Sequence, residues 1–409
     1  MQRVDTIERR NHGHIARLAS SVQRRREGPA NECVLVLQGG GALGSYQAGV
    51  FEALSAKRIA PGWIAGISIG AINGALIAGN PPERRVERLR EFWERVTSGM
   101  PEPSLPTNGA PRAALNQLSA LRTLALGAPG FFSSWLPPAP LQPAGTPQAI
   151  SYYDTEPLRS TLDELVDFDY LNKSPVRLSV GAVNVRTGNL TYFDSVKQRI
   201  DARHIMASGA LPPGFPPVEI DGELYWDGGL VSNTPLFYVF MQPGPTRRTV
   251  FQVDLFSARG RIPATLREAS EREKDIRYSS RTRVITTLAL EQRKVARAAQ
   301  RLMTKLPERL RSDPDAQALA QLSDGCGSGV DVVQLIYRSK DYENDAKDYE
   351  FSRWTMREHW SSGYAEVLQT LRHPAWRGRG TGDGSVRVFD LVERHRECAA
   401  DAKGTGHAH

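Results

Sequence analysis

A short apolar segment that ends in three glycines constrains the fold of this chain most strongly. Residues 33–37, Cys-Val-Leu-Val-Leu, form a continuous run that is typical of a strand buried in a parallel sheet. Glycines occupy positions 39–41, and residues 46–54 then space their apolar side chains as a helix does. A second short apolar run follows at residues 63–67. This order of strand, glycine turn, helix and strand predicts the start of a βαβ unit in an α/β protein.

A serine between two glycines follows the second predicted strand. Gly66-Ile67-Ser68-Ile69-Gly70 fits G-x-S-x-G, the nucleophile elbow, in which the serine sits on a sharp turn from strand to helix. Residues 71–78 are small and apolar, which suits a helix buried against a sheet. The context therefore predicts Ser68 as a nucleophile, with Gly66 and Gly70 as elbow glycines. A turn selected only for close contact between helix and sheet is the alternative.

The glycine loop before the first predicted helix offers backbone amides at a helix N-terminus. Such amides stabilise a developing negative charge, so we expect an oxyanion hole there. Its glycines are Gly39, Gly40, Gly41 and Gly44. Residues 39–44 also fit the dinucleotide fingerprint G-x-G-x-x-G, but such a site needs an acidic residue about 20 positions further on, where the serine elbow stands. A P-loop is excluded because no Gly-Lys-Ser or Gly-Lys-Thr follows the glycines.

A carboxylate at the end of a later predicted strand is the candidate base. Asp227 is followed by Gly228 and Gly229, which let the backbone approach closely, so the carboxylate is placed where it can meet a serine. An Asp-Gly-Gly sequence alone is common in turns. The glycine loop and the serine elbow give it weight as part of a catalytic site.

These three motifs, in this order, resemble the patatin-like phospholipase family of plant and bacterial lipid acyl hydrolases. Residues 207–212, 215–217 and 220–222 are similar to the family's segment that leads into the aspartate. The resemblance covers about residues 31–260 and is closest to bacterial members with an uncharacterised C-terminal domain. It implies a three-layer α/β/α fold with a mixed, mostly parallel central sheet and an α-rich C-terminal extension.

The resemblance also implies a function. Ser68 would be the nucleophile and Asp227 the general base of a Ser-Asp dyad that works through an acyl-enzyme, without a metal or cofactor. The implied activity is that of a lipid acyl hydrolase, a phospholipase A or lysophospholipase type of esterase. One departure concerns Leu43, which stands where many members carry a basic residue. Loss of that charge weighs against substrates that place a phosphate at this position.

Composition changes along the chain indicate its domain organisation. A proline-rich insertion at residues 100–150 contains Phe131, Phe132 and Trp135, which we expect to hold the loop against the domain, with a lid beside the site as the alternative. The expected segments are a basic disordered arm at 1–30, an acyl hydrolase domain at 31–260, a mostly helical C-terminal domain at 261–395 and a disordered tail at 396–409.

A net charge of +7 favours contact with something acidic, and anionic lipid, nucleic acid and an acidic protein are the candidates. No recognition motif for nucleic acid accompanies the charge, and the apolar runs are too short to span a bilayer, so any contact with a lipid surface is expected to be peripheral. The basic segment 265–312 is also suited to a protein partner or an oligomer. The three cysteines stand far apart, which favours a cytoplasmic setting without disulfides. They are Cys33, Cys326 and Cys398.

Two alternatives to a dyad hydrolase remain. An α/β-hydrolase-type esterase would add a late histidine, His359 or His373, to a Ser-Asp-His triad. Neither histidine lies in a glycine-flanked loop after a strand, and the elbow follows only the second predicted strand. A scaffold or regulatory protein of the same fold would act instead through a protein partner.

Overall fold

The computed structural model describes most of the chain between residues 32 and 391. The predicted arm at 1–30 and the predicted tail at 396–409 lie outside the described residues, as do Cys326 and Cys398. The described ranges are 32–101, 109–242, 247–323, 329–340, 342–343, 345–380 and 386–391.

Nine strands of the described chain form one central sheet. They are β1 (Glu32–Leu37), β2 (Trp63–Ile67), β5 (Arg177–Asn184), β6 (Leu190–Asp194), β7 (Val218–Ile220), β8 (Glu223–Asp227), β9 (Arg247–Asp254), β10 (Gly329–Ile336) and β11 (Val386–Phe389). Their order is β11-β10-β9-β1-β2-β5-β8-β7, with β6 also paired to β5. Neighbours from β11 to β5 are parallel, whereas β6 and β8 pair with β5, and β7 with β8, in antiparallel fashion. The predicted mixed, mostly parallel sheet is confirmed.

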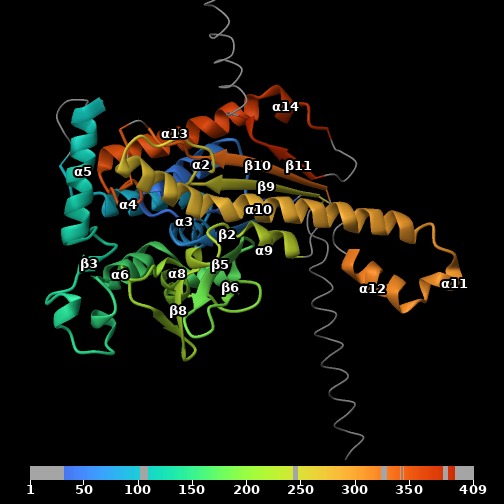
Figure 1. Cartoon of the computed structure of the whole chain (residues 1–409), viewed down its shortest axis with the longest axis horizontal. Helices are drawn as coiled ribbons and strands as arrows, with labels where there is room; N and C mark the ends of the chain where they lie inside the picture. The colour runs from blue at the N-terminus through green and yellow to red at the C-terminus, as the bar shows by residue number, and fades with distance from the viewer. Residues whose placement is uncertain are drawn as a thin grey trace, which may run out of the picture.

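Helices connect these strands and cover the sheet (Figure 1). They are α2 (Ser45–Ala56), α3 (Ile69–Ala78), α4 (Arg85–Val96), α5 (Gly109–Leu126), α6 (Glu156–Leu165), α7 (Phe168–Lys173), α8 (Ala202–Gly209), α9 (Leu236–Met241), α10 (Leu266–Met303), α11 (Glu308–Arg311), α12 (Pro314–Ser323), α13 (Arg353–Arg372) and α14 (Pro374–Arg377). Short 3₁₀ turns include η1 (Gly41–Gly44) and η4 (Gly228–Leu230), and a separate two-stranded ribbon joins β3 (Ser133–Ser134) to β4 (Tyr153–Asp154). None of the described helices combines the length and the apolar character needed to cross a bilayer.

The central strand β1 is buried on both faces, which explains its unbroken apolar sequence. Leu35 and Leu37 belong to one hydrophobic cluster together with residues of α2 and α3. Val34 and Val36 point to the opposite face and join a second cluster that includes residues of α9. Alternate side chains of a strand face opposite sides of a sheet, so a strand between two helical layers must be apolar throughout. The α/β/α layering is confirmed.

The segment after residue 260 contributes to the same sheet and to the same helical layer. Strand β10 pairs with β9 along its whole length, and β11 pairs with β10. Helix α13 packs so closely on α2 that a Cβ on Gly49 would lie 1.9 Å from the Trp360 carbonyl oxygen. On the other helix, a Cβ on Gly363 would lie 2.1 Å from the Tyr46 carbonyl oxygen. The proposed domain division at residue 260 thus separates strands that belong to one continuous sheet.

The proline-rich insertion contains a long helix that its composition did not indicate. Helix α5 begins at Gly109, and Pro111 lies within its first turn. Proline is tolerated there because the first N–H groups of a helix have no intrahelical acceptor. After the helix, Phe131 and Phe132 are buried, as expected for residues that hold the insertion against the domain, whereas Trp135 is half-buried.

We predict that Gly49→Ala destabilises the whole protein. The added methyl group collides with the backbone of α13, and overpacking of this kind costs about 1–3 kcal/mol, which outweighs the better helix propensity of alanine. Urea unfolding followed by circular dichroism measures the change. Gly62→Ala is the matched control, because a Cβ at Gly62 meets no atom within 4 Å. Equal stability of the two variants would contradict the close contact between α2 and α13.

Candidate active site

Ser68 occupies the predicted turn between β2 and α3, with a strained backbone. Its φ is +54° and its ψ is −123°, a conformation that residues with side chains rarely adopt. A Cβ on Gly66 would lie 2.3 Å from the Gly70 carbonyl oxygen, and one on Gly70 would lie 2.4 Å from the Leu37 carbonyl oxygen. Only glycine fits at these two positions, because strand and helix meet without space for a side chain.

Ser208 holds the strained turn in place through hydrogen bonds to the Ser68 backbone. The backbone amide of Ser68 donates to the Ser208 hydroxyl oxygen at 3.0 Å and to its carbonyl oxygen at 3.1 Å. The Ser208 hydroxyl in turn donates to the Gly181 carbonyl oxygen on β5 at 2.7 Å. Sequence reasoning noted the segment around Ser208 but assigned it no role. Its contribution is to fix the backbone from which the Ser68 side chain projects.

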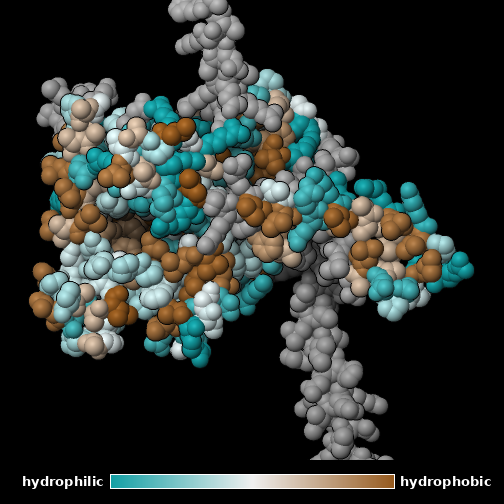
Figure 2. All heavy atoms as spheres, viewed as in Figure 1, coloured by the Kyte–Doolittle hydropathy of each residue, from teal (hydrophilic) through white to brown (hydrophobic). Residues whose placement is uncertain are grey.

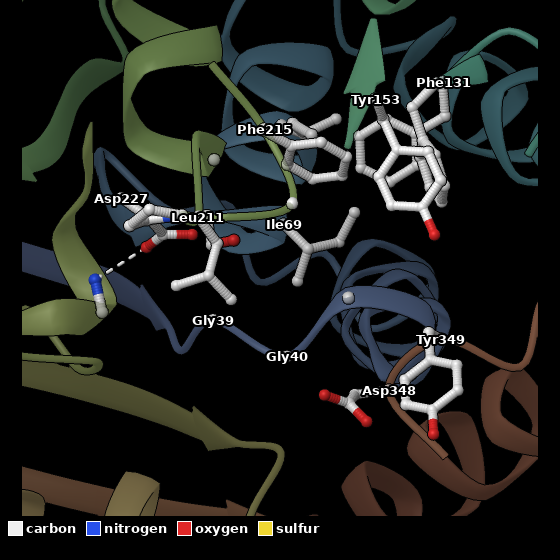
Figure 3. Close-up of a pocket in the computed structure, with 18 of the residues that line it drawn as sticks. Gly39, Gly40, Ile69, Phe131, Tyr153, Leu211, Phe215, Asp227, Asp348 and Tyr349 are labelled. Carbon is white, nitrogen blue, oxygen red and sulfur yellow. Dashed lines mark hydrogen bonds between the residues drawn. The ribbon is translucent and has the colours of Figure 1, made fainter. Parts of the chain in front are cut away.

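Asp227 lies buried at the end of β8 and lines the same cavity as Ser68, whose side chain acts to lower the pKa of the Asp227 carboxyl. The Gly229 amide donates to Asp227 Oδ1 at 2.7 Å, the bond drawn as a dashed line in Figure 3. Burial raises the pKa of Asp227 to about 7, although the hydrogen bonds from Ser68 and Gly229 act in the opposite direction. The carboxyl is therefore suited to exchange a proton with Ser68 near neutral pH.

Asn233 fixes the first glycine of the loop beside this pair. The Gly39 amide donates to the Asn233 carbonyl oxygen at 3.1 Å, and the Asn233 side-chain amide donates to the Gly39 carbonyl oxygen at 3.0 Å. A Cβ on Gly39 would lie 3.1 Å from the Ser68 Cβ, so the loop passes close to Ser68. Asn233 follows the Asp-Gly-Gly sequence by four positions, and no sequence motif assigned it a role.

The four glycines assigned to the oxyanion hole differ in their surroundings. Within the described chain, the amides of Gly40 and Gly41 have no acceptor, and both residues line the cavity that contains Ser68. The Gly39 amide, by contrast, already donates to Asn233. Gly44 is buried, and a Cβ there would meet Ile69 at 2.4 Å, so its missing side chain serves close contact with α3.

Gln38, a buried glutamine directly before the glycine loop, anchors the start of the loop. Gln38 Oε1 accepts from the amides of Leu255 and Phe256 at 2.6 and 3.0 Å, and its Nε2 donates to the Thr234 hydroxyl at 3.0 Å. The Gln47 side chain donates to the Gln38 carbonyl oxygen at 2.6 Å. A fully satisfied buried network rigidifies its surroundings. The one sequence feature that could have indicated this role is the position of Gln38, a polar residue between an apolar strand and the glycines that follow it.

A cavity of about 300 Å³ opens in front of Ser68 and Asp227. One wall is aromatic and includes Phe131, Tyr153 and Phe215 (Figure 3). The Phe132 ring also belongs to it, with ring-centre distances of 4.9 Å to Tyr153 and 5.1 Å to Phe215. Phe131 and Phe351 complete this wall. Phe131 and Phe132 of the insertion thus both fill the core and line the cavity. Apolar walls around a few polar groups are typical of a small-molecule site.

The segment after residue 260 supplies the opposite side of the cavity. Tyr278, Asp348 and Tyr349 line it, and the Asp348 carbonyl oxygen accepts from the Ala42 amide at 2.8 Å. Gly41 has φ +53°, and a Cβ there would lie 2.1 Å from this same oxygen. The C-terminal segment therefore holds the glycine loop in place as well as enclosing the cavity.

No lysine, arginine or histidine is among the described residues that line the cavity. Its carboxylates are Asp227 and Asp348, and Lys274 Nζ lies 2.8 Å from Asp348 Oδ1 behind the wall. Leu43 is completely buried. The side of the cavity near the glycine loop therefore offers no cation to a phosphate group.

Asp254 is a second buried carboxyl whose pKa is raised to about 7 by burial, and it does not line the cavity. Gln252 Nε2 donates to Asp254 Oδ2 at 2.6 Å, and Thr234 also hydrogen-bonds to this carboxyl. It resembles Asp227 in burial and pKa but not in position, which makes it a matched control for the candidate base.

The structure places neither histidine of the triad alternative at the cavity. His359 is buried, and its Nε2 lies 2.6 Å from Glu343 Oε1, with its ring against Tyr337. His373 accepts a hydrogen bond from the Ala375 amide at the start of α14. Both histidines thus serve local structure, and neither lines the cavity that contains Ser68.

Fold and site together define a three-layer α/β/α protein with a serine elbow and a buried aspartate in one cavity. A family model described as patatin-like phospholipase matches residues 35–240, and a second, described as patatin phospholipase, matches residues 276–383. The chain belongs to the patatin-like phospholipase family.

Similar individual proteins cover this chain unevenly. A patatin-like phospholipase domain-containing protein of Caenorhabditis elegans is 33% identical over 90 residues, which is 22% of this chain and only 8% of that protein. VipD from Legionella pneumophila shows a TM-score of 0.35 at 13% identity, over 92% of this chain and 75% of VipD. The complex of SpcU with ExoU from Pseudomonas aeruginosa contains a chain with a TM-score of 0.24 at 17% identity, over 72% of this chain and 68% of that one.

The two family matches meet at the cavity. Ser68 and Asp227 lie in the first matched segment, whereas Tyr278, Asp348 and Phe351 lie in the second. The site is therefore composed of both segments, a feature that the sequence motifs did not indicate.

We predict that Asp227→Asn stabilises the protein at alkaline pH. Burial raises the pKa of Asp227 in the folded state above its unfolded value. Between about pH 4 and pH 7 the unfolded chain therefore releases this proton while the folded chain keeps it, and the wild type loses stability as the pH rises through this range. The variant avoids this loss, which is about 2–4 kcal/mol.

Urea unfolding at about pH 4.5 and about pH 8 measures the difference between variant and wild type. Asp163→Asn, at an exposed position, is the control and should change little at either pH. A stability difference between Asp227→Asn and the wild type that is the same at both pH values would contradict the raised pKa.

Proposed function

We propose that this protein hydrolyses carboxylic esters of lipids, with Ser68 as the nucleophile and Asp227 as the general base. One observation carries the proposal: a serine on a strained turn and a buried carboxyl, whose pKa burial raises to about 7, lie together at one apolar cavity. A nucleophile, an adjacent base and a water-poor binding space are the parts that ester hydrolysis through an acyl-enzyme requires.

The proposed reaction has two halves. In the first, Ser68 Oγ attacks the ester carbonyl carbon and passes its proton to Asp227, while the amides of Gly40 and Gly41 donate to the oxyanion. The alcohol leaves with the proton from Asp227 and the acyl group stays on Ser68. In the second half, water attacks this acyl group as Asp227 takes a proton, and the fatty acid leaves while Ser68 regains its hydrogen.

The cavity favours an acyl chain as the group that is buried. Phe131, Phe132 and Phe215 offer the chain an apolar wall, and burying methylene groups there stabilises the complex by about 0.8 kcal/mol each. No cation among the described lining residues attracts a phosphate. A phospholipase A or lysophospholipase activity therefore requires the phosphate to remain outside the cavity, and esters without phosphate fit equally well.

The alternative of a scaffold protein uses none of these features. An unreactive scaffold has no need of a buried carboxyl of raised pKa beside a serine on a strained turn. A protein partner at the basic segment 265–312 stays a proposal that is compatible with catalysis, and so does a cytoplasmic location.

We predict that a soluble ester, p-nitrophenyl butyrate, is hydrolysed by the wild type and not by Ser68→Ala. Asp227→Asn should lower kcat/KM at least about 100-fold, because a positioned general base contributes about 10²–10⁴-fold. Asp254→Asn and Ser160→Ala are matched controls with turnover near that of the wild type. His359→Gln, which keeps a hydrogen-bonding side chain, tests the triad. Unchanged turnover in Ser68→Ala, or loss of turnover in His359→Gln at full stability, would overturn the dyad.

We also predict that kcat/KM rises with pH through about 7 and then levels off, because only the deprotonated Asp227 accepts a proton from Ser68. Initial rates with the same ester across the neutral range give the profile. Asp254→Asn should keep it, which assigns the titration to Asp227. A profile that is flat through neutral pH would exclude Asp227 as the base.

A further inference from the structure

Helix α5 buries its polar side chains. Arg112, Asn116, Ser119 and Thr123 follow one another at helical spacing and are almost completely buried. A surface helix ordinarily turns its apolar stripe inward and its polar side chains to water. On helix α5 the arrangement is reversed, because the polar stripe faces the protein interior.

The outward face of α5 consists of leucines. Leu118, Leu121, Leu124 and Leu126 are between 46% and 62% exposed. The helix contains no acidic residue, and its charged side chains are Arg112 and Arg122. We call these four leucines the leucine face. Contiguous exposed apolar surface in a soluble protein marks a site that contacts something apolar.

Specific bonds hold α5 in this orientation. Arg112 donates to Glu358 at 2.8 Å and to the Thr355 hydroxyl at 3.2 Å on α13, and to Asn116 at 3.0 Å. The guanidinium also lies over the ring of Trp354 at 5.7 Å. Turning the leucine face inward would leave Arg112 without these partners. The exposure of the leucines is therefore built into the fold.

The leucine face is continuous with the mouth of the cavity. Leu124 belongs to both, since it is 46% exposed and also lines the cavity beside Ser68. The Leu124 carbonyl oxygen accepts from the Tyr153 hydroxyl at 2.8 Å, which ties α5 to the aromatic wall. Figure 2 shows hydrophobic surface over α5 that continues towards the rim of a hollow beside it. Further exposed apolar residues follow α5 in the sequence: Leu136, Leu141, Ile150 and Tyr152.

We infer that the leucine face of α5 docks on the surface of an anionic lipid bilayer. Its leucines enter the acyl region, the absence of acidic residues on α5 avoids repulsion by anionic head groups, and the continuity with the cavity gives an ester a path that avoids water. The role of the face in delivering a substrate rests on the proposed function, whereas docking itself requires no catalysis.

The test is sedimentation of the full chain with vesicles of phosphatidylcholine and phosphatidylglycerol, in a Ser68→Ala background that leaves the lipid intact. The variant pair Leu118→Gln and Leu121→Gln removes two leucines that do not line the cavity, and glutamine keeps the helix propensity. The control pair is Leu288→Gln and Leu302→Gln on α10, whose exposures of 55% and 54% match those of 55% and 53% on α5.

The α5 pair should weaken vesicle binding about tenfold or more, whereas the α10 pair should weaken it less than about twofold. With a serine at position 68, the α5 pair should hydrolyse p-nitrophenyl butyrate at the wild-type rate. No binding by the parent chain, or equal losses in both pairs, would overturn the inference. Dimers that the parent chain forms without vesicles, and that the α5 pair no longer forms, would also overturn the inference. They would indicate that a second copy of the chain covers the leucine face. Lack of ester hydrolysis together with α5-dependent docking would overturn the catalytic proposal alone.

Discussion

A buried carboxyl without a cationic partner is the constraint on which the site depends. The Gly229 amide donates to the Asp227 carboxyl and the Ser68 side chain acts to lower its pKa, but burial is the larger effect and raises this pKa to about 7. This balance requires walls that exclude water, because a hydrated carboxyl would return to a pKa near 4 and become a weaker base. The aromatic wall and the C-terminal segment therefore act on the chemistry without touching the reacting atoms.

The glycine loop is positioned by the same surroundings. Asn233 holds Gly39 from one side, while the Asp348 carbonyl oxygen holds the Ala42 amide from the other. Between them the amides of Gly40 and Gly41 stay unpaired within the described chain. Donors that are already in place require no reorganisation when charge develops. Asp348 reaches this point because β10 and α13 are parts of the same fold as β1 and α2.

Sequence patterns predicted the βαβ start, the serine elbow and the place of Asp227 at the end of a strand, because each depends on neighbouring residues. A buried strand needs a continuous apolar run, and Ser68 needs small residues around it. Contacts across the chain were beyond such reasoning: Ser208 is 140 positions from Ser68, and Asn233 is 194 from Gly39. Helix α5 was missed because its surroundings are rich in proline, and the membership of β10 in the main sheet depends on pairing with β9 far earlier in the chain.

Covalent labelling of the purified protein with a fluorophosphonate probe tests the central claim most directly. The probe reacts with serines that a neighbouring base has activated, and mass spectrometry of the digested protein identifies the modified residue. The account predicts one adduct, on Ser68, that forms faster above pH 7 than below it and forms slowly in Asp227→Asn. An adduct on another serine, or equal labelling with and without the Asp227 carboxylate, would contradict it.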